Sequence, residues 1–265
     1  MSQNFPYQYH LCSEMDQIGE PAQSQKLEGF KYLVIVTQAF GILLVILMAT
    51  WNFCYRDGFA WSSDPKLQFN WHPMLMTLGL VFLYANGMLI YRTQRNVRKR
   101  RLKLIHGGIM LFVLIMTIIG LVAVFSFHNK MNIPNLYSLH SWVGLSAVIL
   151  FAGQWIAGCV SFLYPGIQIT LRAAYMPIHV YFGTAGFIAS VASCLLGLTE
   201  KILFVDFGKE SALKYQNLPP EGVLVNVIGL LFVIFGSLTV YLSSQERYKR
   251  LPRPEDDFLL SSRSN

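Results

Sequence analysis

Six long apolar segments constrain the fold of this chain more than any other feature. They cover approximately residues 32–54, 71–91, 104–125, 139–162, 177–198 and 222–243. Each is about 20 residues long, the length that an α-helix needs to cross a hydrocarbon layer of roughly 30 Å. Because lipid offers no hydrogen bonds to the backbone, such segments must be helices. The sequence therefore predicts an all-α integral membrane protein with six transmembrane helices.

The composition supports one membrane domain with polar ends. Hydrophobic residues make up 54% of the chain and charged residues 13%, a balance unlike that of soluble domains. We expect a disordered tail at residues 1–30, a six-helix domain at 31–245 and a second tail at 246–265. No basic region or small-residue cleavage site precedes the first apolar segment, so we expect it to be a retained anchor and not a signal peptide.

Lysine and arginine residues are concentrated on one side of the predicted bundle. Most lie at 92–103 and 247–253, which share a side if there are six spans. The positive-inside rule then places both termini in the cytosol. The net charge of +7 follows from this topology, because the positive residues flank membrane spans. We therefore expect no nucleic-acid partner.

Four histidines fall near the beginning of four consecutive predicted helices: His72, His106, His140 and His179. An ionisable side chain inside a bilayer is costly, so an intramembrane histidine is a functional candidate. One such residue alone could be a hydrogen-bonded core histidine. Four in consecutive helices argue against independent accidents.

Helix direction sorts these histidines into two pairs. The second and fourth helices run from the outside to the cytosol, so His72 and His140 share the outer half of the membrane. The third and fifth helices run the other way, which places His106 and His179 in the cytosolic half. The sequence thus predicts two histidine pairs, one above the other.

A haem iron with two axial histidines suits such pairs, because the porphyrin supplies the other four ligands. Zinc suits them less well, because its protein sites use three or four close ligands. Glycines near the histidines could let a flat macrocycle approach the backbone, although helix packing explains each of them equally well. These glycines are Gly79, Gly107, Gly108, Gly144 and Gly183.

Several short motifs around these histidines resemble the eukaryotic cytochrome b561 family of ascorbate-reducible transmembrane ferrireductases. The resemblance covers roughly residues 50 to 245, and among animal members it is closest to the lysosomal and duodenal types. The motifs are Phe69-Asn70-Trp71-His72-Pro73, Leu136 to Trp142, Leu171-Arg172, Pro177-Ile178-His179-Val180, Gly197 to Lys201, and Pro220 to Val223.

The resemblance implies two haem b groups within the second to fifth helices, with His72 and His140 as axial ligands of the outer haem and His106 and His179 as those of the cytosolic haem. It also implies cytosolic ascorbate as the electron donor. Ascorbate is an anion at neutral pH, which basic side chains would hold. The matching positions are Arg92, Lys99, Lys103 and Arg172.

On the outer side, the resemblance implies a site where ferric chelates are reduced. The matching positions are His128, which we expect in a loop, Asn135, Tyr137 and Glu221. Imidazole and oxygen groups suit iron or a bound chelator. Phe127 stands where some relatives have a polar residue, so the details of this site stay open.

The family further implies a homodimer. The segment Glu255 to Leu260 resembles an acidic dileucine signal, which sorting adaptors read in the cytosol; this favours a late endosomal or lysosomal membrane over the plasma membrane or a secretory vesicle. Two alternatives stay open at this point. Monodehydroascorbate could replace ferric iron as the acceptor, or the chain could be a haem-free transporter with histidines as a proton relay.

Overall fold

The computed structural model describes residues 27–164, 167–204 and 215–251. Six helical spans in these ranges are long and apolar enough to cross a membrane: Phe30–Tyr55, Pro65–Thr93, Lys99–Lys130, Leu139–Leu163, Ile169–Leu203 and Pro220–Ser244. The predicted fold class is therefore confirmed. The N-terminal tail up to residue 26 and the dileucine-like segment lie outside the described residues.

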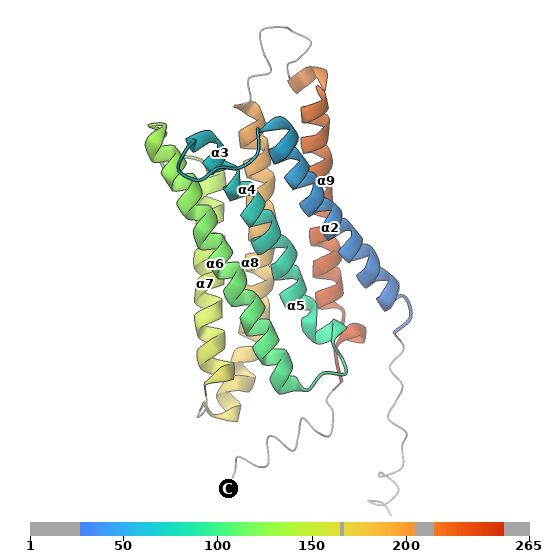
Figure 1. Ribbon diagram of the computed structural model, residues 1–265. Helices are drawn as coiled ribbons and strands as arrows, with labels where there is room; N and C mark the ends of the chain where they lie inside the picture. Colours follow the sequence, from blue (N-terminus) through green and yellow to red (C-terminus); the bar gives the residue numbers. More distant parts are fainter. Residues whose placement is uncertain (1–26, 165–166, 205–214, 252–265) are drawn as a thin grey trace, which may run out of the picture.

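The elements are α2 (Phe30–Tyr55), α3 (Pro65–Phe69), α4 (Trp71–Leu75), η2 (Met76–Leu83), α5 (Tyr84–Thr93), α6 (Lys99–Lys130), α7 (Leu139–Gly158), η3 (Cys159–Leu163), α8 (Ile169–Leu203), η5 (Tyr215–Asn217), α9 (Pro220–Ser244) and η6 (Glu246–Tyr248). Helices α2 and α9 pack together on one flank of the bundle (Figure 1). The second to fifth spans form the rest of it, with α7 packed along α8. The described chain begins and ends at the same end of the bundle (Figure 1).

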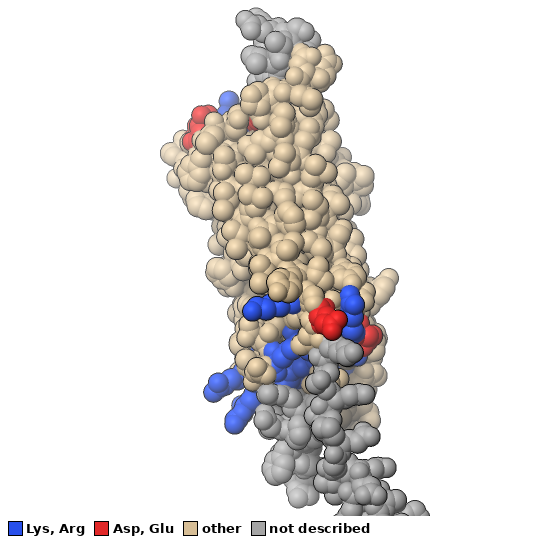
Figure 2. Space-filling view, turned by 90° about the vertical axis from the view of Figure 1, so that its right-hand side faces the viewer, with Lys and Arg blue, Asp and Glu red and all other residues tan. Residues whose placement is uncertain are grey.

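The surface of the bundle is divided into an apolar part along its length and a basic part at one end. Helix α6 exposes an apolar stripe with helical spacing, which consists of Leu111, Ile115, Ile118, Ile119 and Val122. Figure 2 shows a broad belt without charged residues, and the lysine and arginine side chains gather mainly at the lower end, where the described chain also begins and ends (Figure 1). Such a belt matches lipid on its outside, so the chain is a multi-pass membrane protein.

The second span departs from regular α-helix just after its histidine. Pro73 has no backbone N–H, and the Thr77 hydroxyl donates to its carbonyl oxygen at 2.7 Å. A π-helical segment, η2, then runs over Met76–Leu83 before α5 begins. Such wide turns are often found at functional sites. This one shifts the register of the span between His72 and α5.

Local capping fixes the beginning of two histidine-bearing spans. The Asp64 carboxylate accepts a hydrogen bond from the backbone N–H of Lys66 at 2.8 Å, which starts the short α3 before His72. Ser138 and Ser141 form a capping box at the beginning of α7. His140 is the second residue of that helix, so the cap determines its depth.

The fifth span is longer than predicted at both ends. The sequence places its beginning at Pro177, but α8 begins at Ile169 and Pro177 lies inside it. A proline within a membrane helix is tolerated because neighbouring groups satisfy the freed carbonyl. Arg172 therefore lies on the helix and not in a loop, and His179 is three turns in. Similarly, Lys99 and Lys103 belong to the first turns of α6.

Candidate functional site

The four intramembrane histidines meet in two pairs. The ring centroids of His72 and His140 are 6.0 Å apart, with the ring planes at 84°. Those of His106 and His179 are 6.2 Å apart at 74°. Each pair joins alternate spans, the second with the fourth and the third with the fifth, as helix direction predicts.

The spacing within each pair suits a metal between two imidazoles. A metal–nitrogen bond of about 2 Å on each side plus the ring radii requires about 6 Å between centroids. Among the described residues, no group of three or more histidine, cysteine, aspartate or glutamate side chains could hold a metal ion. Each site offers only two facing imidazole ligands. Such a pair suits the axial coordination of a haem iron better than a zinc site, which needs three or four protein ligands.

Backbone carbonyls orient three of the four rings. The Nδ1 atom of His72 lies 3.2 Å from the Gly120 carbonyl oxygen. The Nδ1 atoms of His106 and His140 each lie 2.8 Å from a carbonyl oxygen, of Gly87 and Ser193 respectively. A proton on Nδ1 would donate to these carbonyls and leave the Nε2 lone pair free to bind a metal.

His179 differs from the other three. Its Nδ1 atom is buried and has no hydrogen-bond partner among the described residues. Phe162 and Tyr175 contact its ring instead, with centroids 5.3 and 6.0 Å away. Aromatic packing, and not a carbonyl, therefore holds this imidazole.

A cavity of about 490 Å³ surrounds the outer pair. His72 and His140 line it together with apolar side chains such as Phe69, Met76 and Leu121. An apolar cavity of this size with two facing imidazoles fits a flat macrocycle. The donor set and the surrounding space thus agree with haem.

Two further glycines make room for the histidine rings: Gly197, which begins one of the quoted motifs, and Gly158, which was not singled out from the sequence. A Cβ atom on Gly197 would lie 2.8 Å from Cε1 of His140. One on Gly158 would lie 3.2 Å from Cε1 of His179. The glycines predicted from the sequence differ in their surroundings. Gly79 packs against Met116, whereas a Cβ on Gly108 would have nothing within 4 Å.

Two of the four predicted donor-site cations lie together at the end of the bundle that carries most of the basic residues. Lys103 and Arg172 donate to the carbonyl oxygens of Phe162 and Tyr164, at 3.5 and 3.2 Å, at the end of the fourth span in η3 and the residue that follows it. The Nε atom of Arg172 is buried without a hydrogen-bond partner among the described residues. Phe162, whose carbonyl Lys103 contacts, also packs its ring against His179. The two cations are therefore near that histidine.

Arg92 is used differently. Its guanidinium donates to the carbonyl oxygens of Ser243 and Gln245, at the C-terminal end of α9. Those carbonyls have no partner within the helix, so Arg92 caps α9. Lys99 is the first residue of α6 and its side chain is exposed. It belongs neither to the Lys103 and Arg172 pair nor to the cap formed by Arg92.

At the opposite end of the bundle, three of the four predicted acceptor residues gather at or beside the cavity. His128 and Tyr137 line it, and Asn135 lies beside the His128 ring. His128 lies in the last turn of α6, so the expectation of a loop position is wrong. Its position on the helix directs the ring toward the cavity instead of toward solvent.

Glu200 and Lys201 also line this cavity and were missed as site residues, although the motif that contains them was noted. The Tyr137 hydroxyl donates to Glu200 at 2.9 Å. Partial burial and this hydrogen bond raise the pKa of Tyr137. The signal available in the sequence was a pair of opposite charges at the end of an apolar segment.

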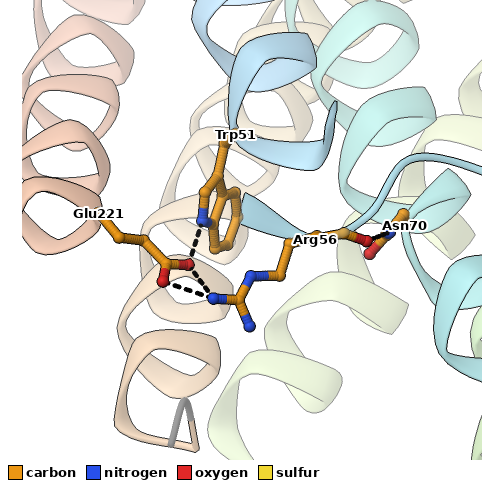
Figure 3. A network of polar contacts seen from close by, with 4 residues as sticks. All are labelled: Trp51, Arg56, Asn70 and Glu221. Carbon is orange, nitrogen blue, oxygen red and sulfur yellow. Dashed lines mark hydrogen bonds and ion pairs between the residues drawn. The ribbon is translucent and has the colours of Figure 1, made fainter. Parts of the chain in front are cut away.

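Glu221 is not free to take part in the acceptor site. It is buried, it forms an ion pair with Arg56, and it accepts a hydrogen bond from Nε1 of Trp51 at 2.8 Å. The Asn70 side chain donates to the Arg56 carbonyl oxygen at 2.8 Å, and these four residues form one network (Figure 3). Glu221 therefore joins α9 to α2 and does not line the cavity.

Known proteins share this sequence along most of its length. The family model for eukaryotic cytochrome b561 matches residues 71–205. The transmembrane ascorbate-dependent reductase of Homo sapiens is 44% identical over 228 residues, which cover 86% of this chain and 88% of that protein. The lysosomal membrane ascorbate-dependent ferrireductase of Danio rerio is 42% identical over 232 residues, or 86% and 93%. The plasma membrane ascorbate-dependent reductase of Xenopus tropicalis is 41% identical over 238 residues, or 87% and 81%.

Proposed function

The chain belongs to the eukaryotic cytochrome b561 family, and from this premise we propose that it is a transmembrane ascorbate-dependent ferric reductase. It takes electrons from ascorbate in the cytosol and delivers them to ferric iron on the opposite side of the membrane. The names of the relatives from Danio rerio and Homo sapiens support this reaction. The two histidine pairs, with centroid separations of 6.0 and 6.2 Å, are the observation that carries it.

We assign His72 and His140 to one haem b and His106 and His179 to a second. Haem b supplies a one-electron carrier at each level of the membrane when it is bound. These imidazoles would hold the haem iron from both sides, which would leave no coordination site for oxygen or substrate. Hydrogen bonds to the Gly120, Gly87 and Ser193 carbonyls keep three imidazoles in the required tautomer.

The donor site lies at the end of the bundle that carries most of the basic residues, and we propose that this end is cytosolic. Ascorbate is an anion that gives up one electron and one proton in each turn. Lys103 and Arg172 would hold it beside His179, because both cations donate to carbonyl oxygens at the end of the fourth span, where Phe162 packs against that ring. Arg92 and Lys99 would contribute less directly to ascorbate binding, because Arg92 caps α9 and Lys99 is exposed.

On the opposite side, His128 and Tyr137 border the cavity of the outer pair. They offer an imidazole and a phenol to a ferric chelate, which suits a metal with oxygen and nitrogen ligands. The 42% identity to a lysosomal ferrireductase over 86% of this chain and the dileucine-like segment support a late endosomal or lysosomal membrane. As in the family, we expect a homodimer.

Purified protein reduced by ascorbate provides the test. Ferric citrate is added while the haem α-band is followed, and rapid loss of the reduced band with formation of ferrous iron supports the proposal. Vesicles loaded with ascorbate then rank ferric citrate against monodehydroascorbate as the external acceptor. Faster reduction of monodehydroascorbate would make the protein a regenerator of ascorbate, and a colourless protein would contradict haem binding altogether.

A further inference from the structure

Lys201 occupies an unusual position for a lysine. It lies two residues from the end of α8, where its ammonium stands 4.2 Å above the centre of the Phe69 ring. The ring of Phe69 is 6.2 Å from that of His72, and Lys201 lines the same cavity as both histidines of the outer pair. A cation is thus held one aromatic ring away from a proposed haem ligand.

No carboxylate in the part of the chain that the structure describes forms an ion pair with this cation. Among the described residues, Lys201 forms no salt bridge and no side-chain hydrogen bond. A partly buried ammonium without an anion is costly in an apolar cavity, and contact with an aromatic face recovers only part of that cost.

Two carboxylates of the described residues near Lys201 are already engaged elsewhere. Glu221 pairs with Arg56 and accepts from Trp51, as Figure 3 shows. Glu200 accepts the hydrogen bond of the Tyr137 hydroxyl. The other charged neighbours of Lys201 are Arg56 and Lys66, which are also cations. The field at this edge of the cavity is therefore suited to an added anion.

We infer that Lys201, above Phe69, is the cationic half of a carboxylate-binding site at the outer edge of the cavity. The site would take a carboxylate from one of two sources, a propionate of the resident haem or the chelator of an arriving ferric complex such as citrate. This inference rests on the proposed function for the identity of the ligand. Its geometry rests on the cavity, the aromatic contact and the engaged neighbours.

The experiment compares purified, haem-loaded Lys201→Met with Lys201→Arg and Lys66→Met. Lys66 is an exposed outer cation that does not line the cavity, so its variant removes the same charge from the same side. Two quantities are measured. The first is the midpoint potential of each haem without an acceptor, and the second is KM for ferric citrate beside that for hexaammineruthenium(III), an acceptor without carboxylates.

If the ligand is a haem propionate, Lys201→Met lowers the midpoint potential of one haem, because loss of a cation favours the oxidised form. If it is the chelator, both potentials are unchanged and KM for ferric citrate rises about tenfold, the size of one lost charged hydrogen bond, while KM for hexaammineruthenium does not rise. Lys201→Arg retains wild-type behaviour in either case. Unchanged potentials and an unchanged KM in Lys201→Met would overturn the inference, as would an equal effect of Lys66→Met.

Haem loss is also informative. If Lys201→Met and Lys201→Gln both lose haem and Lys201→Arg keeps it, a resident carboxylate needs the cation, and loss from all three variants would overturn the site. The proposed function fails separately, if wild-type protein does not reduce ferric citrate. The potential measurement still tests Lys201 in that event.

Discussion

Gly197 of α8 lies directly against the imidazole of His140 on α7, so closely that a single added methyl group would come within 2.8 Å of the ring. No flexible side-chain end is available to yield there, because the ring is held at its Nδ1 atom by the Ser193 carbonyl. The glycine therefore determines where the outer histidine points.

This contact yields a prediction about haem content. Gly197→Ala should displace His140 and remove most of the haem held by the outer pair, while the cytosolic pair keeps its own. Absorbance and EPR spectra of the purified variant measure this. Gly153→Ala is the matched control, because nothing lies within 4 Å of a Cβ at that position. Two intact low-spin signals in Gly197→Ala would contradict the assignment.

The two histidine pairs should lose haem independently. His72→Ala and His106→Ala are each expected to remove one of two bis-histidine signals and about half of the bound haem, because each pair serves one iron. His128→Ala removes a histidine from the same side as His72 but should retain both signals. A variant of His72 with full haem content would show that another residue binds the outer iron.

Lys103 and Arg172 should affect the donor and not the haem. Arg172→Met and Lys103→Met are expected to raise KM for ascorbate about tenfold, because each removes one charged contact to an anion. High salt should reduce the difference from wild type. Lys31→Met, at an exposed position near the start of α2, is the control. Equal KM values for all three variants would mean that the donor binds elsewhere.

Glu221 is expected to matter for stability more than for acceptor binding. Glu221→Gln leaves the Arg56 guanidinium without its anion, and breaking such a pair costs about 3 kcal/mol. The melting temperature of the purified protein should fall, and KM for ferric citrate should stay near that of wild type. Glu246→Gln, which breaks an exposed ion pair with Lys249, should leave the melting temperature unchanged. A raised KM with normal stability would return Glu221 to the acceptor site.

The number of spans and the meeting of alternate helices could be predicted because both follow from hydrophobic length and chain direction. Helix ends could not. Pro177 reads as a helix start in the sequence, yet in a bundle the neighbouring spans support a helix through it, which moves Arg172 onto α8. His128 was also misplaced, because α6 continues beyond its apolar part and hydrophobicity alone does not show where the helix ends.

The outer site shows a second limit of sequence reasoning. Glu221 looks like a site residue until its partners are known, and the partner Arg56 is 165 residues away in the chain. Conversely, Lys201 becomes interesting only when it is seen above Phe69 and beside the cavity. The charges are readable from the sequence, but which of them neutralise each other depends on long-range packing. The haem roles of the four histidines stay predictions.

The packing of α2 against α9 has a consequence for biosynthesis. Of the six described spans, α2 leaves the ribosome first and α9 last, so Trp51 meets its hydrogen-bond acceptor Glu221 only after the four spans between them have been made. Until then, one side of α2 carries an indole N–H and the Arg56 guanidinium without their partner. Translation order therefore makes closure of this flank the final step of assembly, and a chain that ends before α9 would expose both groups to lipid or to quality-control factors.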